Sequence, residues 1–162
     1  MNFSQLFQMQ RDLDHYIEQQ RGITEDVFER KVLALLVELG ELANETRCFK
    51  FWSSKGPSDR PVILEEYVDS VHFLLSLGIE KNLDHELTEW PRDQHHQDLT
   101  ESFLHTYESI AVLRGEPTLS HYKDVWSNYA EIARHLGFTT EDVTSAYVKK
   151  NEINYARQQT DY

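Results

Sequence analysis

The sequence predicts an all-α protein, and three observations support that prediction. Apolar residues recur at helical spacing through most of the 162 residues. No clear run of alternating β-branched residues is present, and no Asn-Gly or Asp-Gly pair marks a hairpin turn. All four prolines fall between the apolar segments, where they do not interrupt a helix. We therefore predict a helical bundle and, because no segment has the composition of a linker, a single domain over residues 1–162.

Two helices are expected in the N-terminal third. The first ends near Gly22, and its apolar stripe consists of Leu6, Met9, Leu13, Tyr16 and Ile17. Thr24 is the predicted N-cap of the second helix, because Glu25 and Asp26 would then lie in the first turn, where acidic side chains favour the helix dipole. The second helix is expected to run to about Thr46.

The third helix is expected after a loop over residues 50–61, which contains glycine and proline breakers. It begins at Pro61 or just after, and its predicted end is Gly78, a residue suited to a left-handed cap. The polar segment 82–96 that follows is expected to be irregular.

Three more helices are expected in the C-terminal half. One covers about residues 99–113 and stops before Gly115 and Pro117. The next ends at Gly137, and Thr140 is the predicted cap of the last helix, which extends towards the C-terminus. The helix before Gly137 has an apolar stripe whose aromatic members suit either a subunit interface or the core: Tyr122, Val125, Trp126, Tyr129, Ile132, Ala133 and Leu136.

The composition excludes several classes of protein. A formal net charge of −12 argues against binding nucleic acid or an anionic membrane, and it is compatible with collecting cations. A single cysteine, Cys48, excludes a disulfide framework and a cysteine-based zinc site. No apolar run approaches the roughly 20 residues that span a bilayer, and the N-terminus lacks the layout of a signal peptide. We expect a soluble, cytoplasmic protein.

Two pairs of acidic residues lie inside the two most apolar helices. Glu38 and Glu41 are three residues apart, as are Glu66 and Asp69, so each pair shares one helix face. Carboxylates held close together in a groove repel each other, and a hard divalent cation such as Mg²⁺ or Mn²⁺ relieves that repulsion. A metal of this kind, which keeps open positions for water and phosphate, suits hydrolysis of a phosphoanhydride. The other interpretation is a pair of solvated helix faces.

Histidine-containing metal sites fit the sequence poorly. Asp69 and His72 form an acid-x-x-His pair, which is half of a di-iron bundle motif, but no second copy follows Glu38 or Glu41. The adjacent histidines His95 and His96 lie in a polar segment and are expected at the surface.

The predicted last helix carries a concentrated polar face. Lys150, Asn154 and Arg157 recur at helical spacing, with Asn151 beside them. Next to a metal-binding cluster, these side chains would hold phosphate oxygens, and an arginine can do so with two hydrogen bonds. The other interpretation is a solvated helix whose cations favour its C-terminal dipole.

The four segments ELGELANE, FKFW, EEYVDSVHFLLSLG and KKNEINYARQQTDY together resemble the dimeric, all-α dUTPases, a branch of the all-α NTP pyrophosphatase superfamily that also contains the MazG-like enzymes. The resemblance spans most of the chain, except for residues 80–138. It implies a four-helix-bundle core with additional helices, homodimerisation, and Mg²⁺-dependent hydrolysis of dUTP, and of dUDP, to dUMP by a metal-activated water, which keeps uracil out of DNA.

The resemblance also implies roles for the acidic and basic residues. Glu38, Glu41, Glu66 and Asp69 would bind two or more Mg²⁺ ions, with Mn²⁺ as a substitute. Glu41, with Glu38, would be catalytic by orienting or deprotonating the attacking water. The residues that would hold phosphates are Lys150, Asn154, Arg157, Asn151 and Lys55.

Contacts to the nucleoside follow from the same resemblance. Phe73 would lie against the deoxyribose and crowd out a 2′-hydroxyl, and His72 beside it is a further candidate for the base or sugar. Trp52 fits either stacking on uracil or packing in its loop. Gln10 and Asp14 would contact the base, but relatives commonly have asparagine in place of Asp14. An ionised carboxylate only accepts hydrogen bonds, so it suits the uracil N3–H and not a carbonyl.

Two other functions remain open at this point. One is a MazG-like pyrophosphatase that acts on another nucleotide, such as dCTP or a damaged dNTP. The other is a non-catalytic helical dimer that binds a partner protein or cations. The family pattern also ends in a tyrosine, here Tyr162 after Asp161, whose role the sequence does not define.

Overall fold

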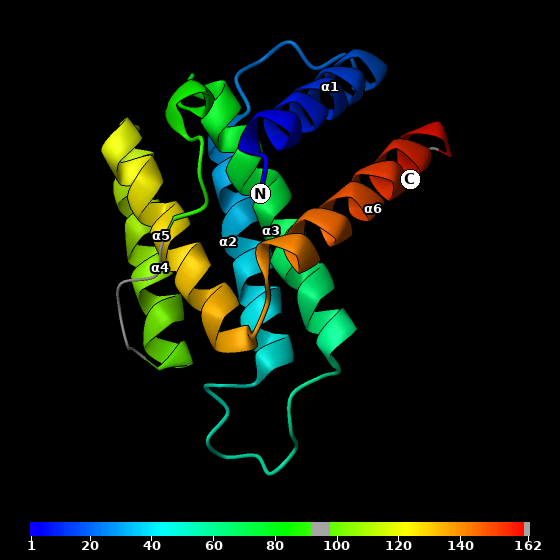
Figure 1. Ribbon diagram of the computed structural model, residues 1–162. Coiled ribbons are helices and arrows are strands. Elements are labelled where there is room, and N and C mark those ends of the chain that lie inside the picture. Colours follow the sequence, from blue (N-terminus) through cyan, green and yellow to red (C-terminus); the bar gives the residue numbers. More distant parts are fainter. Residues whose placement is uncertain (92–97, 161–162) are drawn as a thin grey trace.

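A computed structural model of the chain describes residues 1–91 and 98–160 (Figure 1). Within those residues the secondary structure is entirely helical, which confirms the predicted all-α class. It comprises six α-helices and one short 3-10 helix: α1 (Phe3–Arg21), α2 (Phe28–Thr46), α3 (Arg60–Glu80), η1 (Asp84–Glu86), α4 (Leu99–Gly115), α5 (Leu119–Leu136) and α6 (Thr140–Gln159). The histidine pair His95–His96 and the terminal Asp161 and Tyr162 lie outside the described residues.

Helices α2 and α3 lie side by side at the centre of the molecule and run antiparallel (Figure 1). The α4–α5 pair packs beside α2, and α1 and α6 pack against α3 on the other side. The α2–α3 loop joins the ends of the two central helices, so a residue late in α2 lies opposite a residue early in α3. This arrangement turns the two acidic pairs towards the same region.

The aromatic stripe of α5 belongs to the core. Its three aromatic side chains are 0% exposed: Tyr122, Trp126 and Tyr129. They are buried within one subunit, so they do not form a subunit interface. Trp126 packs edge-on against Phe3 of α1, with ring centroids 4.9 Å apart. The hydroxyl of Tyr67 in α3 donates to the backbone carbonyl of Tyr129 at 2.8 Å. The stripe therefore ties α5 to α1 and α3.

Two of the predicted N-caps were misplaced. Helix α2 begins at Phe28 and not after Thr24, because Asp26 Oδ1 accepts a hydrogen bond from the Phe28 amide at 2.8 Å and holds the preceding residues in a turn. Helix α6 is capped by Thr139 and not by Thr140. The Thr139 side chain accepts from the Asp142 amide and Asp142 accepts from the Thr139 amide, which is a reciprocal capping box.

Two glycines allow close packing between helices. Gly78 was predicted to end the third helix, but α3 continues to Glu80. A Cβ atom at Gly78 would lie 2.2 Å from the Tyr122 hydroxyl oxygen, which itself donates to the Leu74 carbonyl. Gly40 in α2 similarly lets the Tyr107 hydroxyl of α4 approach, since a Cβ there would lie 3.1 Å from it.

None of the helices in residues 1–91 and 98–160 combines the length and the hydropathy that a transmembrane span requires.

Candidate active site

Three carboxylates from the central helices converge. Glu38 of α2 and Glu66 and Asp69 of α3 each offer an oxygen, and these oxygens lie within 4.8 Å of one another. The three side chains are partly buried. Helical spacing places Glu66 and Asp69 on one face of α3, and antiparallel packing brings Glu38 opposite them. A donor set of three hard oxygens in a concave site fits a divalent cation such as Mg²⁺ or Mn²⁺.

The electrostatics of this acidic cluster favour a bound cation. Burial, followed by the negative charges of Asp69, Glu41 and Glu66, raises the pKa of Glu38 to about 7. Burial and the charge of Asp69 likewise raise the pKa of Glu66. For Asp69, burial raises the pKa and the neighbouring Lys150 opposes that rise. The carboxylates therefore repel each other, and positive charge at this position lowers their energy.

Glu41 lies outside this three-residue cluster. Its side chain is exposed on α2, although its charge raises the pKa values of both Glu38 and Glu66. Its predicted part in metal binding and catalysis stays a prediction.

The polar face of α6 meets the acidic cluster through Lys150. The Lys150 ammonium donates to Asp69 at 2.7 Å and to Glu65 at 2.9 Å, and the lysine is buried. Glu65 is a partner that the sequence reasoning missed, because it is not part of either spaced acidic pair. Asn151 is buried beside Lys150, and its Nδ2 has no hydrogen-bond partner among the described residues.

A cavity of about 450 Å³ extends from the acidic cluster between α1, α2, α3 and α6. It contains most of the predicted site residues: Gln10, Asp14, Glu38, Asp69, His72, Phe73, Lys150, Asn154 and Arg157. The rest of its wall combines apolar residues, Leu13, Ile17, Ile23, Val27 and Ala34, with the polar residues Glu18, Arg30, Lys31 and Ser76. An apolar cleft with polar groups at both ends suits an elongated ligand of mixed polarity.

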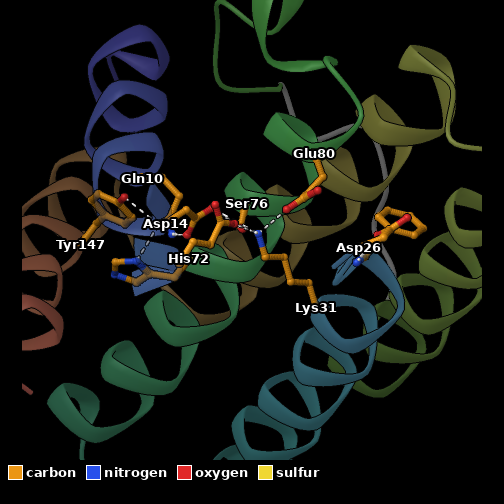
Figure 2. A network of polar contacts seen from close by, with 10 residues as sticks. Gln10, Asp14, Asp26, Lys31, His72, Ser76, Glu80 and Tyr147 are labelled. Atoms are coloured by element: carbon orange, nitrogen blue, oxygen red, sulfur yellow. Dashed lines mark hydrogen bonds and ion pairs between the residues drawn. The ribbon is translucent and has the colours of Figure 1, made fainter. Parts of the chain in front are cut away.

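A network of polar contacts joins α1, α2, α3 and α6 beside this cavity (Figure 2). Gln10 donates to Asp14 at 2.7 Å, and the Gln10 carbonyl oxygen accepts from the Tyr147 hydroxyl at 2.9 Å. His72 Nδ1 lies 2.8 Å from the same Gln10 oxygen, and its ring stacks on Tyr147. Burial, and secondarily the charge of Lys150, lowers the pKa of His72 to about 3, so this histidine is neutral.

Lys31 and Ser76 complete that network, and the sequence reasoning identified neither. Ser76 donates to Asp14 at 2.5 Å, and the Lys31 ammonium lies 3.6 Å from the same carboxylate (Figure 2). Lys31 belongs to no recognised motif. The only sequence feature that could have indicated its role is its position two turns before Glu38 on the same helix face.

Three predicted contact residues do not line this cavity: Trp52, Lys55 and Asn151. Trp52 is 65% exposed on the α2–α3 loop, where its ring packs edge-on against Phe49 and Phe51. Lys55 is exposed in the same loop. Their predicted contacts with base and phosphate stay predictions.

Comparison with known proteins identifies the family. A family model described as dUTPase matches residues 2–162, which is nearly the whole chain. The chain belongs to the dUTPase family. No curated protein sequence matches it.

Membership assigns the reaction class of this dUTPase. It is a hydrolase, a dUTP diphosphatase, whose substrate is a small nucleotide. The family match favours dUTP over the other nucleotides of a MazG-like enzyme, and it argues against the non-catalytic dimer. The all-helical fold agrees with the resemblance stated from the sequence.

Proposed function

We propose that this dUTPase hydrolyses dUTP with Mg²⁺ bound by Glu38, Glu66 and Asp69, and that it also hydrolyses dUDP. The observation that supports the proposal is the convergence of these three carboxylates, two of which, Glu38 and Asp69, line the cavity. Bound Mg²⁺, of which we expect two or more and which Mn²⁺ can replace, supplies positive charge for the phosphates and acidifies water. Both dUTP and dUDP carry the phosphoanhydride bond that such a site would cleave.

The remaining residues near the acidic cluster have roles in positioning. Glu41 lies on the same helix face as Glu38, one turn away, and is proposed to orient or deprotonate the attacking water. Lys150, Asn154 and Arg157 are proposed to hold the phosphate oxygens, because all three line the cavity from α6 beside the acidic cluster. Asn151 is proposed to act with them, and Lys55 from the loop.

The nucleoside is proposed to lie along the cavity towards α1. Phe73 lines the cavity one helical turn beyond Asp69, where it would pack on the deoxyribose and leave no room for a 2′-hydroxyl. The base would then reach Gln10, Asp14 and His72 at the far end.

A homodimer is proposed from an exposed apolar face, because single exposed apolar residues are normal on a surface but a group of them indicates an interface. Leu33 and Val37, one turn apart on α2, are 63% and 50% exposed. Leu104 on the neighbouring α4 is 58% exposed. Light scattering of the wild type and of a Leu33→Lys variant tests this assignment, since the variant is expected to be monomeric and a dimeric variant would contradict it. We propose that the enzyme acts in the cytoplasm, where it keeps uracil out of DNA.

The experiment that tests metal-dependent catalysis is a titration of metal-free enzyme with Mg²⁺ or Mn²⁺, with dUTP and dUDP as substrates. We expect dUMP formation to require the metal. A Glu66→Gln variant should bind Mn²⁺ more weakly in electron paramagnetic resonance, whereas Glu152→Gln, an exposed position on α6, should not. Hydrolysis that is unchanged by a chelator would refute the proposal.

A further inference from the structure

The residues at the two ends of the cavity are equally spaced on the two central helices. Lys31 and Glu38 are seven residues apart on α2, and Ser76 and Asp69 are seven residues apart on α3. Seven residues are two turns, or about 10 Å along each helix. Because α2 and α3 run antiparallel, the Lys31–Ser76 end and the Glu38–Asp69 end face each other along the length of the cavity.

Asp14 fixes the direction of the hydrogen bonds at the Lys31 end. Burial raises the pKa of Asp14, and the charge of Lys31 and the hydrogen bonds from Ser76 and Gln10 oppose that rise. The ionised carboxylate only accepts, so the Gln10 group that contacts it must be the amide NH₂. The Gln10 carbonyl oxygen then accepts from Tyr147 and from His72, so His72 carries its proton on Nδ1. His72 Nε2 is left as a buried acceptor, with no hydrogen-bond partner among the described residues. Gln10, Asp14 and His72 therefore form a chain of fixed polarity.

Lys31 is the cation beside Asp14 at this end, and it has hydrogen-bonding capacity left. Arg30, which also lines the cavity, pairs with the exposed Glu25 at 3.0 Å. The Lys31 ammonium donates to Glu80 at 2.5 Å, whereas Asp14 and Glu18 lie at 3.6 and 3.7 Å, beyond ordinary hydrogen-bond distance. An ammonium has three N–H groups, so a ligand in the cavity can accept from it. Burial lowers the pKa of Lys31, but the charges of Asp14, Glu80 and Glu18 outweigh that effect and raise it, so the side chain stays charged.

We propose that Lys31 is a specificity-determining residue that donates a hydrogen bond to the 4-carbonyl of uracil. The proposal rests on the proposed function, in which the phosphates lie at the acidic cluster and the base at the Lys31 end. The 4-carbonyl lies on the side of the base away from the sugar. Ser76, one turn beyond Phe73 on α3, donates to Asp14, and Lys31 lies beside the same carboxylate. Asp14, beside Lys31, can accept from the neighbouring N3–H of the base.

This pair of contacts separates uracil from cytosine. Cytosine carries an amino group at position 4 and an unprotonated N3, so a donor would face Lys31 and an acceptor would face Asp14. Lys31 and the amino group would both be donors, and Asp14 and N3 would both be acceptors, so neither hydrogen bond could form. A site built for hydrogen bonds rejects such a mismatch strongly. Lys31 also supplies the hydrogen-bond donor that the Asp14 carboxylate lacks.

The test compares kcat/KM for dUTP, dCTP and dTTP in the wild type and in K31M. Thymine has the same carbonyl and N3–H as uracil, so it serves as an internal control. We expect the preference for dUTP over dCTP to fall roughly 10- to 100-fold in K31M, the amount that one hydrogen bond to a charged group contributes. The preference for dUTP over dTTP should stay the same, because Lys31 does not contact the 5-position.

Two further variants distinguish base recognition from a structural role. E80Q removes the carboxylate that accepts from Lys31 but leaves the lysine in place, so it should retain the preference for dUTP over dCTP. K31Q, whose amide can rotate to accept from an amino group, should lose that preference even if K31M does not fold. K123M, at an exposed lysine of α5, controls for loss of charge alone.

Binding of dUMP and dCMP, measured calorimetrically with a chelator present, separates this proposal from the metal-dependent mechanism. The wild type should bind dUMP more tightly than dCMP, and K31M and K31Q should lose that difference. Folded K31M or K31Q that keeps the wild-type preference within about twofold, in both assays, would overturn the role of Lys31. Loss of the preference in E80Q as well would assign the effect to the Lys31–Glu80 ion pair and would also overturn it.

Discussion

Replacement of Glu38 by glutamine tests the central electrostatic feature of the site. Burial and the charges of Asp69, Glu41 and Glu66 raise the pKa of Glu38 from 4.5 to about 7. The metal-free folded state therefore binds more protons than the unfolded state between these values, and its free energy of unfolding falls as the pH rises through that window. Above about pH 7, Glu38 is charged in both states and the folded state is destabilised by the full amount. Glutamine carries no charge, so the Glu38→Gln variant avoids the penalty.

The expected difference in the free energy of unfolding follows from the pKa shift of Glu38. Each pKa unit corresponds to about 1.4 kcal/mol, so the shift from 4.5 to about 7 sets an upper bound of roughly 3 kcal/mol. Glu38 is only partly buried, and solvent screening reduces that figure to about 1–2 kcal/mol. We therefore expect metal-free Glu38→Gln to be more stable than the wild type by that amount at about pH 8, and equal to it below about pH 4.5.

Urea denaturation followed by circular dichroism, with a chelator or with excess Mg²⁺, measures both effects. Excess Mg²⁺ should stabilise the wild type by binding only the folded state, and should stabilise Glu38→Gln much less. Glu152→Gln, at an exposed position of α6, should behave as the wild type in both conditions. Equal stability of the wild type and Glu38→Gln at about pH 8, or an undiminished response of the variant to Mg²⁺, would contradict the charge repulsion assigned to Glu38.

Three further predictions concern catalysis, the sugar and packing. Glu41→Gln is expected to lower kcat at least roughly 100-fold without unfolding the protein, because it removes a proton acceptor from an exposed position; a folded, fully active variant would remove Glu41 from the mechanism. Phe73→Ala should reduce discrimination against UTP by opening space for the 2′-hydroxyl, as measured by the ratio of kcat/KM for dUTP and UTP, and an unchanged ratio would mean that another group senses the sugar. Gly78→Ala should cost about 1–3 kcal/mol in thermal unfolding, because its Cβ would meet the Tyr122 hydroxyl at 2.2 Å. Gly56→Ala, where no atom lies within 4 Å, is the matched control, and equal melting temperatures for the two alanine variants would contradict the packing argument.

The all-α class and most helix boundaries were predictable because helical periodicity is local. The same holds for Gly22 and Gly137, which cap α1 and α5 in the left-handed conformation. Gly78 was misread because a glycine that ends a helix and a glycine that admits a neighbouring side chain look alike in sequence. Only the position of Tyr122, 44 residues later in the chain, distinguishes the two cases.

The candidate site also combines features that local spacing predicts with features that depend on helix packing. Spacing alone put Glu38 and Glu41 on one face of a helix, but the register between α2 and α3 decided that Glu38 meets Glu66 and Asp69 while Glu41 stays exposed. Register depends on packing across the whole helix pair, and no short motif encodes it.

The helical architecture, the two acidic faces and the resemblance to the dUTPases were predictable from the sequence alone, because each depends on residues close together in the chain. Helix packing determines which carboxylates converge, that Lys150 bridges Asp69 and Glu65, and that Lys31 faces Asp14 in the same cavity. The physical reason is that charges interact through space, and the distances between side chains on different helices are fixed by how those helices pack.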